Sequence, residues 1–293
     1  MPKELNHTPV IIIGAGRTGT NMLRDVICSI DGFGTWDCDE INPVWRYGNR
    51  FKPTDILSPE LARPKVKNYI RGRFNQLKKV QNLEYVVEKT CANSLRLAFV
   101  HEVFPEAKYI LINRDGRDVA PSAKIRWTAP FELNYTLKKL KQTPLRDLPY
   151  YIWKFGINRL KQAFGADRLS FWGPVYPGID ADFKNKSLLE VCALQWQACV
   201  QATQADKDKL AADQFIEVKY ERFVNNPQDE LKTILDFLGK NGAKSEEIAK
   251  AVARVSNRSV GSHKKLSAEE QEALNEICEP TLLALNYSNV SSQ

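Results

Sequence analysis

A glycine-rich segment near the amino terminus has the composition of an anion-binding turn. It reads Gly14-Ala15-Gly16-Arg17-Thr18-Gly19-Thr20-Asn21 and follows the apolar run Val10–Ile13. Apolar residues continue after it at helical spacing, so the segment links a strand to a helix. Backbone N–H groups and the positive end of the helix dipole converge in a turn of this kind. The segment therefore predicts a site for a phosphate, a sulfate or a similar anion.

The same loop fits the dinucleotide-binding pattern G-x-G-x-x-G. Asp37 and Asp39 lie at about the distance where such folds carry the acid that binds a ribose. Residues 32–36 would have to form the second strand of that unit, and their two glycines disfavour a strand. An NAD-dependent Rossmann oxidoreductase is therefore an alternative that rests on one short pattern.

The loop also comes close to the Walker pattern G-x-x-x-x-G-K-[ST], with Gly14 and Gly19 in place. Thr20 stands where that pattern has its phosphate-binding lysine, and Asn21 where it has the hydroxyl that binds Mg²⁺. A P-loop nucleotide kinase is a second alternative, which these two positions disfavour. The cation of this loop is Arg17, which suits a ligand with one phosphate at the loop, a transferred group beside it and no metal.

A second cluster of cationic and hydroxyl groups follows a later apolar segment. Lys108–Asn113 leads into Arg114-Asp115-Gly116-Arg117-Asp118-Val119-Ala120-Pro121-Ser122, and Arg126 lies one helical turn beyond Ser122. Guanidinium groups and a hydroxyl at the end of a parallel strand form an anion pocket. The alternative interpretation is a solvated helix start with internal Arg–Asp pairs. Pro121 is expected in the first turn of this helix, where proline is tolerated.

Together, the two segments resemble the nucleotide-binding motifs of sulfotransferases that use 3′-phosphoadenosine 5′-phosphosulfate (PAPS). Val10–Leu23 is similar to their 5′-phosphosulfate loop, a strand followed by G-x-x-R-S-G-T-T and a helix. Arg114–Ser122 is similar to their 3′-phosphate motif, R-D-x-R-D-x-x-x-S. Glu88-Lys89-Thr90 resembles the E-K-[ST] of the Golgi-type branches, and Lys219-Tyr220-Glu221 resembles the late strand that closes the nucleotide site. The resemblance, to the Golgi-type, tyrosylprotein-like or bacterial branch, implies PAPS as donor and 3′-phosphoadenosine 5′-phosphate (PAP) as product.

The resemblance also implies which residues bind the nucleotide. Arg17 and the loop amides would hold the 5′-phosphosulfate, and Arg114 and Ser122 would hold the 3′-phosphate. Arg126 falls where the tyrosylprotein branch has a further arginine on that phosphate, and Tyr220 would pack near the adenine. The full implied set is Gly14, Ala15, Gly16, Arg17, Thr18, Gly19, Thr20, Asn21, Arg114, Ser122, Arg126, Tyr220 and, from the C-terminal basic stretch, Arg258.

For the transfer itself, the resemblance implies three catalytic residues, Glu40, Lys89 and Arg17. Lys89 would reach the sulfonate and the bridging oxygen, and Arg17 would stabilise the leaving phosphate. Glu40 is the candidate base for the acceptor proton, because Cys38-Asp39-Glu40 is similar to a C-G-E segment of the tyrosylprotein branch. Asp39 is the second candidate, and a solvated loop is the alternative interpretation of this acidic pair.

Other side chains with acid–base chemistry have weaker assignments. Cys91 stands where the cytosolic branch has a catalytic histidine, and it could act as a base only with a lowered pKa. His101 is expected to be structural, whereas His7 and His263 are expected at the surface.

The scaffold that positions these residues is indicated by the N-terminal half of the sequence, in which apolar strand-like runs alternate with amphipathic helical segments. Such alternation predicts an α/β fold, a single P-loop-like domain over residues 1–293 whose central parallel β-sheet is flanked by helices. A mostly helical, aromatic-rich lid insertion is expected at about 124–186, as the acceptor-binding region. The predicted strands are Val10–Ile13, Tyr85–Glu88, Lys108–Asn113 and Phe215–Lys219, and the predicted helices cover Met22–Ile30, a stretch with Leu95, Phe99 and Val103 on one face, Leu188–Ala205 and Pro227–Leu238.

Composition excludes several classes of protein. The 293 residues are 43% hydrophobic and 26% charged, which is ordinary for a globular chain and excludes collagen-like and disordered proteins. No apolar run approaches the roughly 18 residues of a spanning helix. The six cysteines show no C-x-x-C spacing, so no metal site is predicted.

A net charge of +7 favours anionic partners without choosing among them. The excess is spread along the chain without an RNA-binding signature, so nucleic acid is not expected as a partner. The expected partners are the nucleotide donor and a hydroxyl acceptor, which is a carbohydrate, a glycolipid or a protein tyrosine. A cytoplasmic, bacterial-type soluble enzyme is the default expectation, with a trimmed luminal domain as the alternative, and no oligomeric state is predicted.

Overall fold

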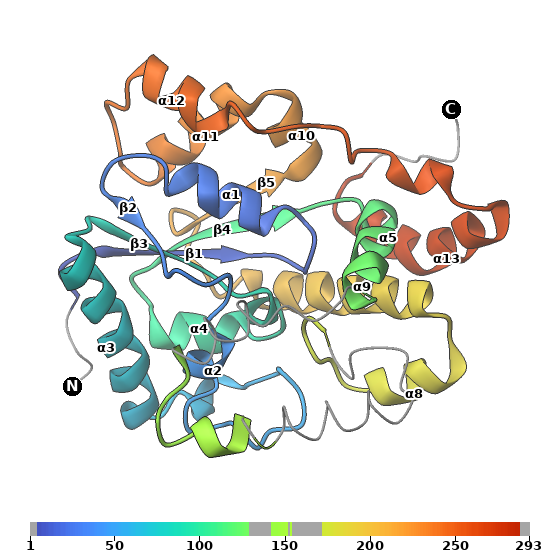
Figure 1. The fold of residues 1–293 in the computed structure, drawn as a ribbon, viewed down its shortest axis with the longest axis horizontal. Helices are drawn as coiled ribbons and strands as arrows, with labels where there is room; N and C mark the ends of the chain where they lie inside the picture. Colours follow the sequence, from blue (N-terminus) through green and yellow to red (C-terminus); the bar gives the residue numbers. More distant parts are fainter. Residues whose placement is uncertain (1–4, 129–141, 152, 154–171, 288–293) are drawn as a thin grey trace.

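The computed structural model of the chain describes residues 5–128, 142–151, 153 and 172–287. Within these ranges, five strands form one sheet in the order β2-β3-β1-β4-β5, and every adjacent pair is parallel (Figure 1). The strands are β1 (Thr8–Ile13), β2 (Phe33–Gly34), β3 (Tyr85–Lys89), β4 (Lys108–Asn113) and β5 (Phe215–Lys219). Since β1 lies between β3 and β4, the loops after these three strands meet at one edge of the sheet, where α/β folds bind ligands.

Helices cover both faces of the sheet and continue beyond its carboxyl edge (Figure 1). One face is covered by α1 (Thr20–Ile27), α10 (Tyr220–Asn225), α11 (Pro227–Phe237) and α12 (Ser245–Val252). The other is covered by α2 (Asn42–Trp45), α3 (Pro64–Gln81) and α4 (Leu97–Val103). A third cluster joins α5 (Gly116–Trp127), α8 (Ile179–Asn185), α9 (Leu188–Lys207) and α13 (Ala268–Ala284). Short 3₁₀ helices are η1 (Pro59–Leu61), η2 (Cys91–Leu95) and η3 (Ser262–Lys265).

Strand β1 is apolar on both faces, which fixes it in the centre of the molecule. Ile11 and Ile13 belong to the core beneath α2, α3 and α4, and Val10 and Ile12 belong to the core beneath α1 and α11. All four side chains are at most 1% exposed. Continuous apolar runs of this kind are typical of parallel strands with helices on both sides.

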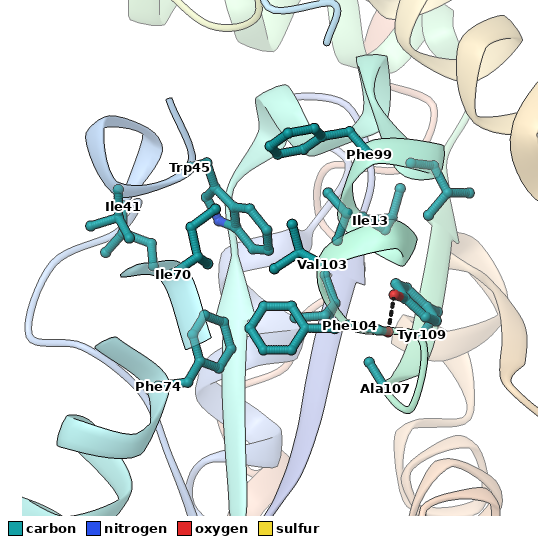
Figure 2. Packing of buried hydrophobic residues seen from close by; sticks show 14 of the residues in the cluster. Ile13, Ile41, Trp45, Ile70, Phe74, Phe99, Val103, Phe104, Ala107 and Tyr109 are labelled. Carbon is teal, nitrogen blue, oxygen red and sulfur yellow. Dashed lines mark hydrogen bonds between the residues drawn. The ribbon is translucent and has the colours of Figure 1, made fainter. Parts of the chain in front are cut away.

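Aromatic rings fill the core between β1 and α3 (Figure 2). The ring of Phe104 lies 4.5 Å from that of Phe74 and 5.9 Å from that of Trp45, measured between centroids. The Tyr109 hydroxyl, buried among them, donates a hydrogen bond to the Phe104 carbonyl at 2.8 Å. This packing holds the sheet against α3 and α4.

The predicted fold class is confirmed, and the four predicted strands all form. Residues 32–36, predicted to be a poor strand, contribute only the two residues of β2 at the sheet edge. Helix α3, with 18 residues, was not predicted. Much of the expected insertion at about 124–186 lies outside the described residues, namely 129–141, 152 and 154–171.

Helix α1 is shorter than its apolar pattern predicts. It ends at Ile27, and Ile30 lies in the tight turns that follow, whose N–H groups reach back only three residues. Ile30 nevertheless packs in the same core as Leu23 and Val26. The apolar spacing therefore continues past the end of the helix.

The predicted place of Pro121 in a first helical turn is wrong. The Asp115 side chain accepts a hydrogen bond from the Arg117 backbone N–H at 2.9 Å and caps α5, which therefore begins at Gly116. Pro121 is the sixth residue of the helix, where it lacks the N–H that would pair with the Arg117 carbonyl.

Candidate active site

The loop between β1 and α1 has a backbone shape that its glycines make possible. A Cβ on Gly14 would lie 2.8 Å from the Ile112 carbonyl oxygen, and one on Gly19 would lie 2.5 Å from the ring of Tyr220. Gly19 and Arg17 both have positive φ angles, of 92° and 71°. Left-handed residues in a short loop turn successive N–H groups toward one side, as in anion-binding nests.

Thr18 closes the loop from inside. It is fully buried, and its hydroxyl donates to the Ala15 carbonyl at 2.8 Å. Asn21, in the first turn of α1, has a buried Oδ1 that finds no donor among the described residues. The loop is therefore internally braced, with an unpaired polar atom beside it.

The two predicted anion-binding segments meet in space. Arg17 Nε donates to Ser122 Oγ at 3.0 Å, and Arg114 Nη1 donates to the Arg17 carbonyl at 3.1 Å. The Arg114 guanidinium stacks on the ring of Tyr220, 4.3 Å from its centroid. Arg114 Nε is buried and has no acceptor within the described part of the chain. Residues about a hundred positions apart thus form one cluster of cationic and hydroxyl groups at the edge where β1 and β4 end, which we call the cationic pocket.

The electrostatics of this pocket favour an anion. Burial lowers the pKa of Arg17, and the positive charges of Arg126 and Arg114 lower it further. Arg126 is itself half-buried. A cationic group whose charge is disfavoured by its surroundings gains most when a negative ligand binds beside it.

Only part of the Arg114–Ser122 motif faces this pocket. Arg117 forms an ion pair with Asp115, at 2.6 Å between Nη2 and Oδ2, and its Nη1 donates to Asn275. Asp115 and Arg117 therefore match the alternative interpretation of internal Arg–Asp pairs, whereas Arg114 and Ser122 line the pocket with Arg17.

A carboxylate and an amine lie together at the end of β3. Lys89 Nζ donates to Glu40 Oε1 at 3.1 Å, and the Cys91 backbone N–H donates to the same oxygen at 3.3 Å. Burial alone would lower the pKa of Lys89, but the Glu40 carboxylate outweighs burial, and the pKa is raised. The Lys89 amine is therefore protonated and positively charged at neutral pH. Asp39 does not join this pair in the same way, because its backbone carbonyl and its carboxylate both contact Arg24.

Cys91 joins this end of the site to the glycine loop. Its sulfur lies 3.7 Å from Thr20 Oγ1. Burial raises the pKa of the Cys91 thiol to about 12, so it is a neutral thiol at neutral pH. The lowered pKa that a cysteine base would need is absent.

Beneath Glu40 lies a buried polar network that was not predicted. Glu88 accepts hydrogen bonds from the Thr90 hydroxyl at 2.5 Å and from Asn93 Nδ2 at 3.0 Å. Thr90 Oγ1 in turn accepts from the Ile41 backbone N–H at 3.2 Å. Glu88 thereby holds the backbone next to Glu40. Burial raises the pKa of Glu88 to about 7.

The comparison with known families identifies the family of the chain. The model of the Sulfotransferase family matches residues 9–169 and 158–241 in two overlapping segments. The chain belongs to the sulfotransferase family. No curated protein matches the chain.

Solved sulfotransferases share the fold at low sequence identity. The sulfotransferase domain from the curacin biosynthetic pathway is 13% identical, with a TM-score of 0.53 over 97% of this chain and 99% of its own. A sulfotransferase from Alicyclobacillus acidocaldarius is 15% identical, with a TM-score of 0.52 over 96% and 95%. A sulfotransferase from Mycobacterium tuberculosis is 12% identical, with a TM-score of 0.53 over 94% and 77%. At these identities the likeness concerns the fold.

Two properties of this sulfotransferase can be stated for its described residues. No described helix has both the length and the hydropathy that crossing a bilayer requires. Over the same ranges, no three or more His, Cys, Asp or Glu side chains gather as a metal-binding group.

The surface position predicted for His263 is wrong, and His7 is half-buried. His263 is buried, at 8% exposure, because its ring is held by Asp118, 145 positions earlier in the chain. His7 has both ring nitrogens buried, and burial, followed by the nearby Lys78, lowers its pKa to about 4. His101 lies in α4 with its ring against Tyr109, as a structural role requires.

Three further residues at the site of this sulfotransferase had no role predicted for them individually. Ser259 contacts both Arg114 and Tyr220, and it lies beside Arg258, which is exposed. Trp172 packs on the loop, where a Cβ on Gly16 would lie 3.1 Å from its ring. Ser259 lies in the C-terminal basic stretch, Trp172 in the expected aromatic-rich insertion and Thr90 in the E-K-T motif, so each belongs to a segment that was predicted to contribute to the site.

The buried carboxyl of Glu88 predicts a pH-dependent stability. Between its ordinary pKa of 4.5 and about 7, the folded state holds the Glu88 proton more firmly than the unfolded state. Its contribution to the free energy of unfolding therefore decreases as pH rises through this interval and levels off above it. Glu88→Gln removes this titration. We expect the free energy of unfolding of wild type, relative to the variant, to be lower at about pH 7 than at about pH 5.

Urea unfolding of both proteins at the two pH values measures this difference. Glu84→Gln, which removes an exposed carboxylate just before β3, is the control for loss of an acid and should show a much smaller change with pH. An equal stability difference between wild type and Glu88→Gln at both pH values would contradict the assignment.

Proposed function

We propose that this sulfotransferase moves the sulfuryl group of PAPS to an acceptor hydroxyl of a carbohydrate, a glycolipid or a protein tyrosine, and releases PAP. The observation that carries the proposal is the junction of Arg17, Arg114 and Ser122 in one pocket, since PAPS has anionic groups at both its 5′ and 3′ positions. Membership of the family supports the reaction class.

Both halves of the pocket support PAPS as the donor. The loop and Arg17 would bind the 5′-phosphosulfate, and Arg114 with Ser122 would bind the 3′-phosphate. The unpaired Nε of Arg114 and the unpaired Oδ1 of Asn21 fit a ligand with hydrogen-bonding groups at these places. An NAD-dependent oxidoreductase leaves the Arg114 half without a role, and a nucleotide kinase would lack the Walker lysine and hydroxyl at Thr20 and Asn21.

The residues at the end of β3 suit an in-line transfer. The acceptor oxygen forms a bond to sulfur while the bridging bond between sulfur and the 5′-phosphate oxygen breaks, and its electron pair stays on PAP. Lys89 and Arg17 would stabilise the charge that develops on that oxygen and on the sulfonate. Glu40 would take the proton of the acceptor hydroxyl. None of these steps is assigned to a metal.

Glu40 is favoured over the other candidate bases by its contacts. Its carboxylate lies against Lys89 and the Cys91 backbone, whereas Asp39 is engaged with Arg24. The high pKa of the Cys91 thiol disfavours it as a base. Trp172, beside the loop, offers an aromatic surface on which a sugar or an aromatic acceptor would stack.

Nucleotide binding tests the donor assignment. We expect wild type to bind PAP in calorimetry much more tightly than 5′-AMP, NAD or Mg-ATP. Arg114→Ala should weaken PAP about 10- to 100-fold, because charge-assisted hydrogen bonds to the 3′-phosphate are lost. Its affinity for 5′-AMP should change by less than about threefold. Arg254→Ala, which removes an exposed guanidinium, is the matched control. Binding of NAD or Mg-ATP in place of PAP would contradict the proposal.

Turnover tests the catalytic roles separately from binding. With labelled PAPS and an acceptor found by screening, kcat should fall about 100-fold or more in Glu40→Gln and in Lys89→Ala. PAP lacks the sulfonate, so its affinity should stay close to that of wild type in both variants. Lys79→Ala, on the exposed side of α3, is the control for loss of a lysine. Full activity of Glu40→Gln would remove the base assignment alone, and full activity of Lys89→Ala would remove the role of the amine.

A further inference from the structure

The chain between α12 and α13 contacts Arg114 and Tyr220 of the cationic pocket. Residues 256–263, which we call the strap, include the start of η3 and pack against α5 (Figure 1). On the inner side, the Ser259 carbonyl accepts a hydrogen bond from Arg114 Nη2 at 2.7 Å. The Ser259 hydroxyl lies 2.8 Å from the Tyr220 hydroxyl. The strap therefore touches both the guanidinium and the ring that define the Arg114 half of the pocket.

One carboxylate fastens the strap to α5. Asp118 Oδ2 accepts from the Gly261 backbone N–H at 2.7 Å. Asp118 Oδ1 accepts from the Ser262 hydroxyl at 3.1 Å and the His263 backbone N–H at 3.0 Å, and it lies 2.7 Å from His263 Nδ1. The Asp118 side chain is nearly inaccessible to solvent. Burial acts to raise the pKa of Asp118, but the donors from His263 and Gly261 hold it below its usual value.

The negative charge of Asp118 is compatible with an anion site nearby because donors of the strap pair with both of its carboxylate oxygens. An ionised carboxylate one helical turn from Arg114 would otherwise repel a phosphate or pair with the arginine. Its two oxygens are instead occupied by three consecutive residues of the strap. Outside the Asp118 contacts, Ser259 of the strap contacts Arg114 and Tyr220, and Asn257 Nδ2 donates a hydrogen bond to Asn225 Oδ1 at 3.1 Å.

We propose that Asp118 is a positioning residue for recognition of the 3′-phosphate. By fastening Gly261, Ser262 and His263, it holds Ser259 against Arg114 and Tyr220 and so fixes the orientation of the Arg114 guanidinium. Asp118 does not touch the nucleotide. This inference rests on the proposed function, and it extends that function to a residue whose contacts lie wholly within the protein.

Asp118→Asn is the most direct test, since asparagine keeps the shape but replaces one oxygen by a donor. Either orientation of the amide places its NH₂ against N–H or O–H donors of the strap. We expect PAP to bind about tenfold more weakly, while 5′-AMP, which lacks the 3′-phosphate, changes by less than about twofold. Asp236→Asn, an equal change of charge on the exposed side of α11, is the control and should leave both affinities unchanged.

His263 provides a second test that leaves Asp118 in place. His263→Ala removes one of the four donors and should weaken PAP by a smaller factor, about threefold. His263→Asn, whose side-chain amide can donate from nearly the position of Nδ1, should restore part of that loss. Thermal unfolding of each variant identifies loss of fold, and if Asp118→Asn does not fold, the His263 pair decides.

Hydrogen exchange of the strap gives a readout that does not depend on nucleotide. The backbone amides of Gly261 and His263 should exchange faster in Asp118→Asn than in wild type, and PAP should slow their exchange in wild type.

The outcomes separate this inference from the proposed function. If wild type prefers PAP over 5′-AMP and Asp118→Asn keeps the same preference, the positioning role is wrong and the proposed function stands. If folded Asp118→Asn loses equal affinity for both nucleotides, the residue has only a general structural role, which also overturns the inference. If wild type binds PAP and 5′-AMP equally, the proposed function fails and the inference fails with it.

Discussion

Repulsion among the guanidinium groups of Arg17, Arg114 and Arg126 is the constraint on which the site depends. Two of them lie on different loops at the carboxyl edge of the sheet, and the third lies on the helix that follows β4. Desolvation lowers the pKa of Arg17, and the charges of the other two groups lower it further. The three groups stay together because β1 and β4 are held in the sheet between two apolar cores. The stacking of Arg114 on Tyr220 offsets part of the cost. Binding of an anionic ligand would recover the rest.

The reacting end of the site shows a second arrangement of charge, in which opposite signs are paired. Lys89 and Glu40 form a partly exposed ion pair above a buried carboxyl, Glu88, whose raised pKa marks the cost of burying it. Thr90 links the two levels, because it donates to Glu88 and accepts from the backbone beside Glu40. Sites that position charged groups in this way commonly give up some stability for function.

How much of this structure the sequence predicts depends on whether the residues concerned lie together in the chain or far apart. The glycine loop and the Arg114 segment are contiguous motifs, and the strands before them are apolar runs, so both anchors and the parallel sheet could be predicted. Catalytic roles for Glu40 and Lys89, and the place of Cys91 at the histidine position of the cytosolic branch, were also predicted, through resemblance to a known family. Contacts of the strap were not, because hydrogen bonds between residues 118 and 263 leave no periodicity in the sequence. For the same reason His263 was expected at the surface, and Pro121 was misplaced because the capping by Asp115 depends on local geometry.

The central claim is that one nucleotide spans both anchors, and a crystal structure of the protein with PAP tests it most directly. The account predicts the 5′-phosphate within the loop from Gly14 to Asn21 and the 3′-phosphate between Arg114 and Ser122, with Arg17 between the two. A complex in which PAP occupies only the loop and its 3′-phosphate lies away from Arg114 would contradict the account, because the second anchor would then have no part in binding the donor.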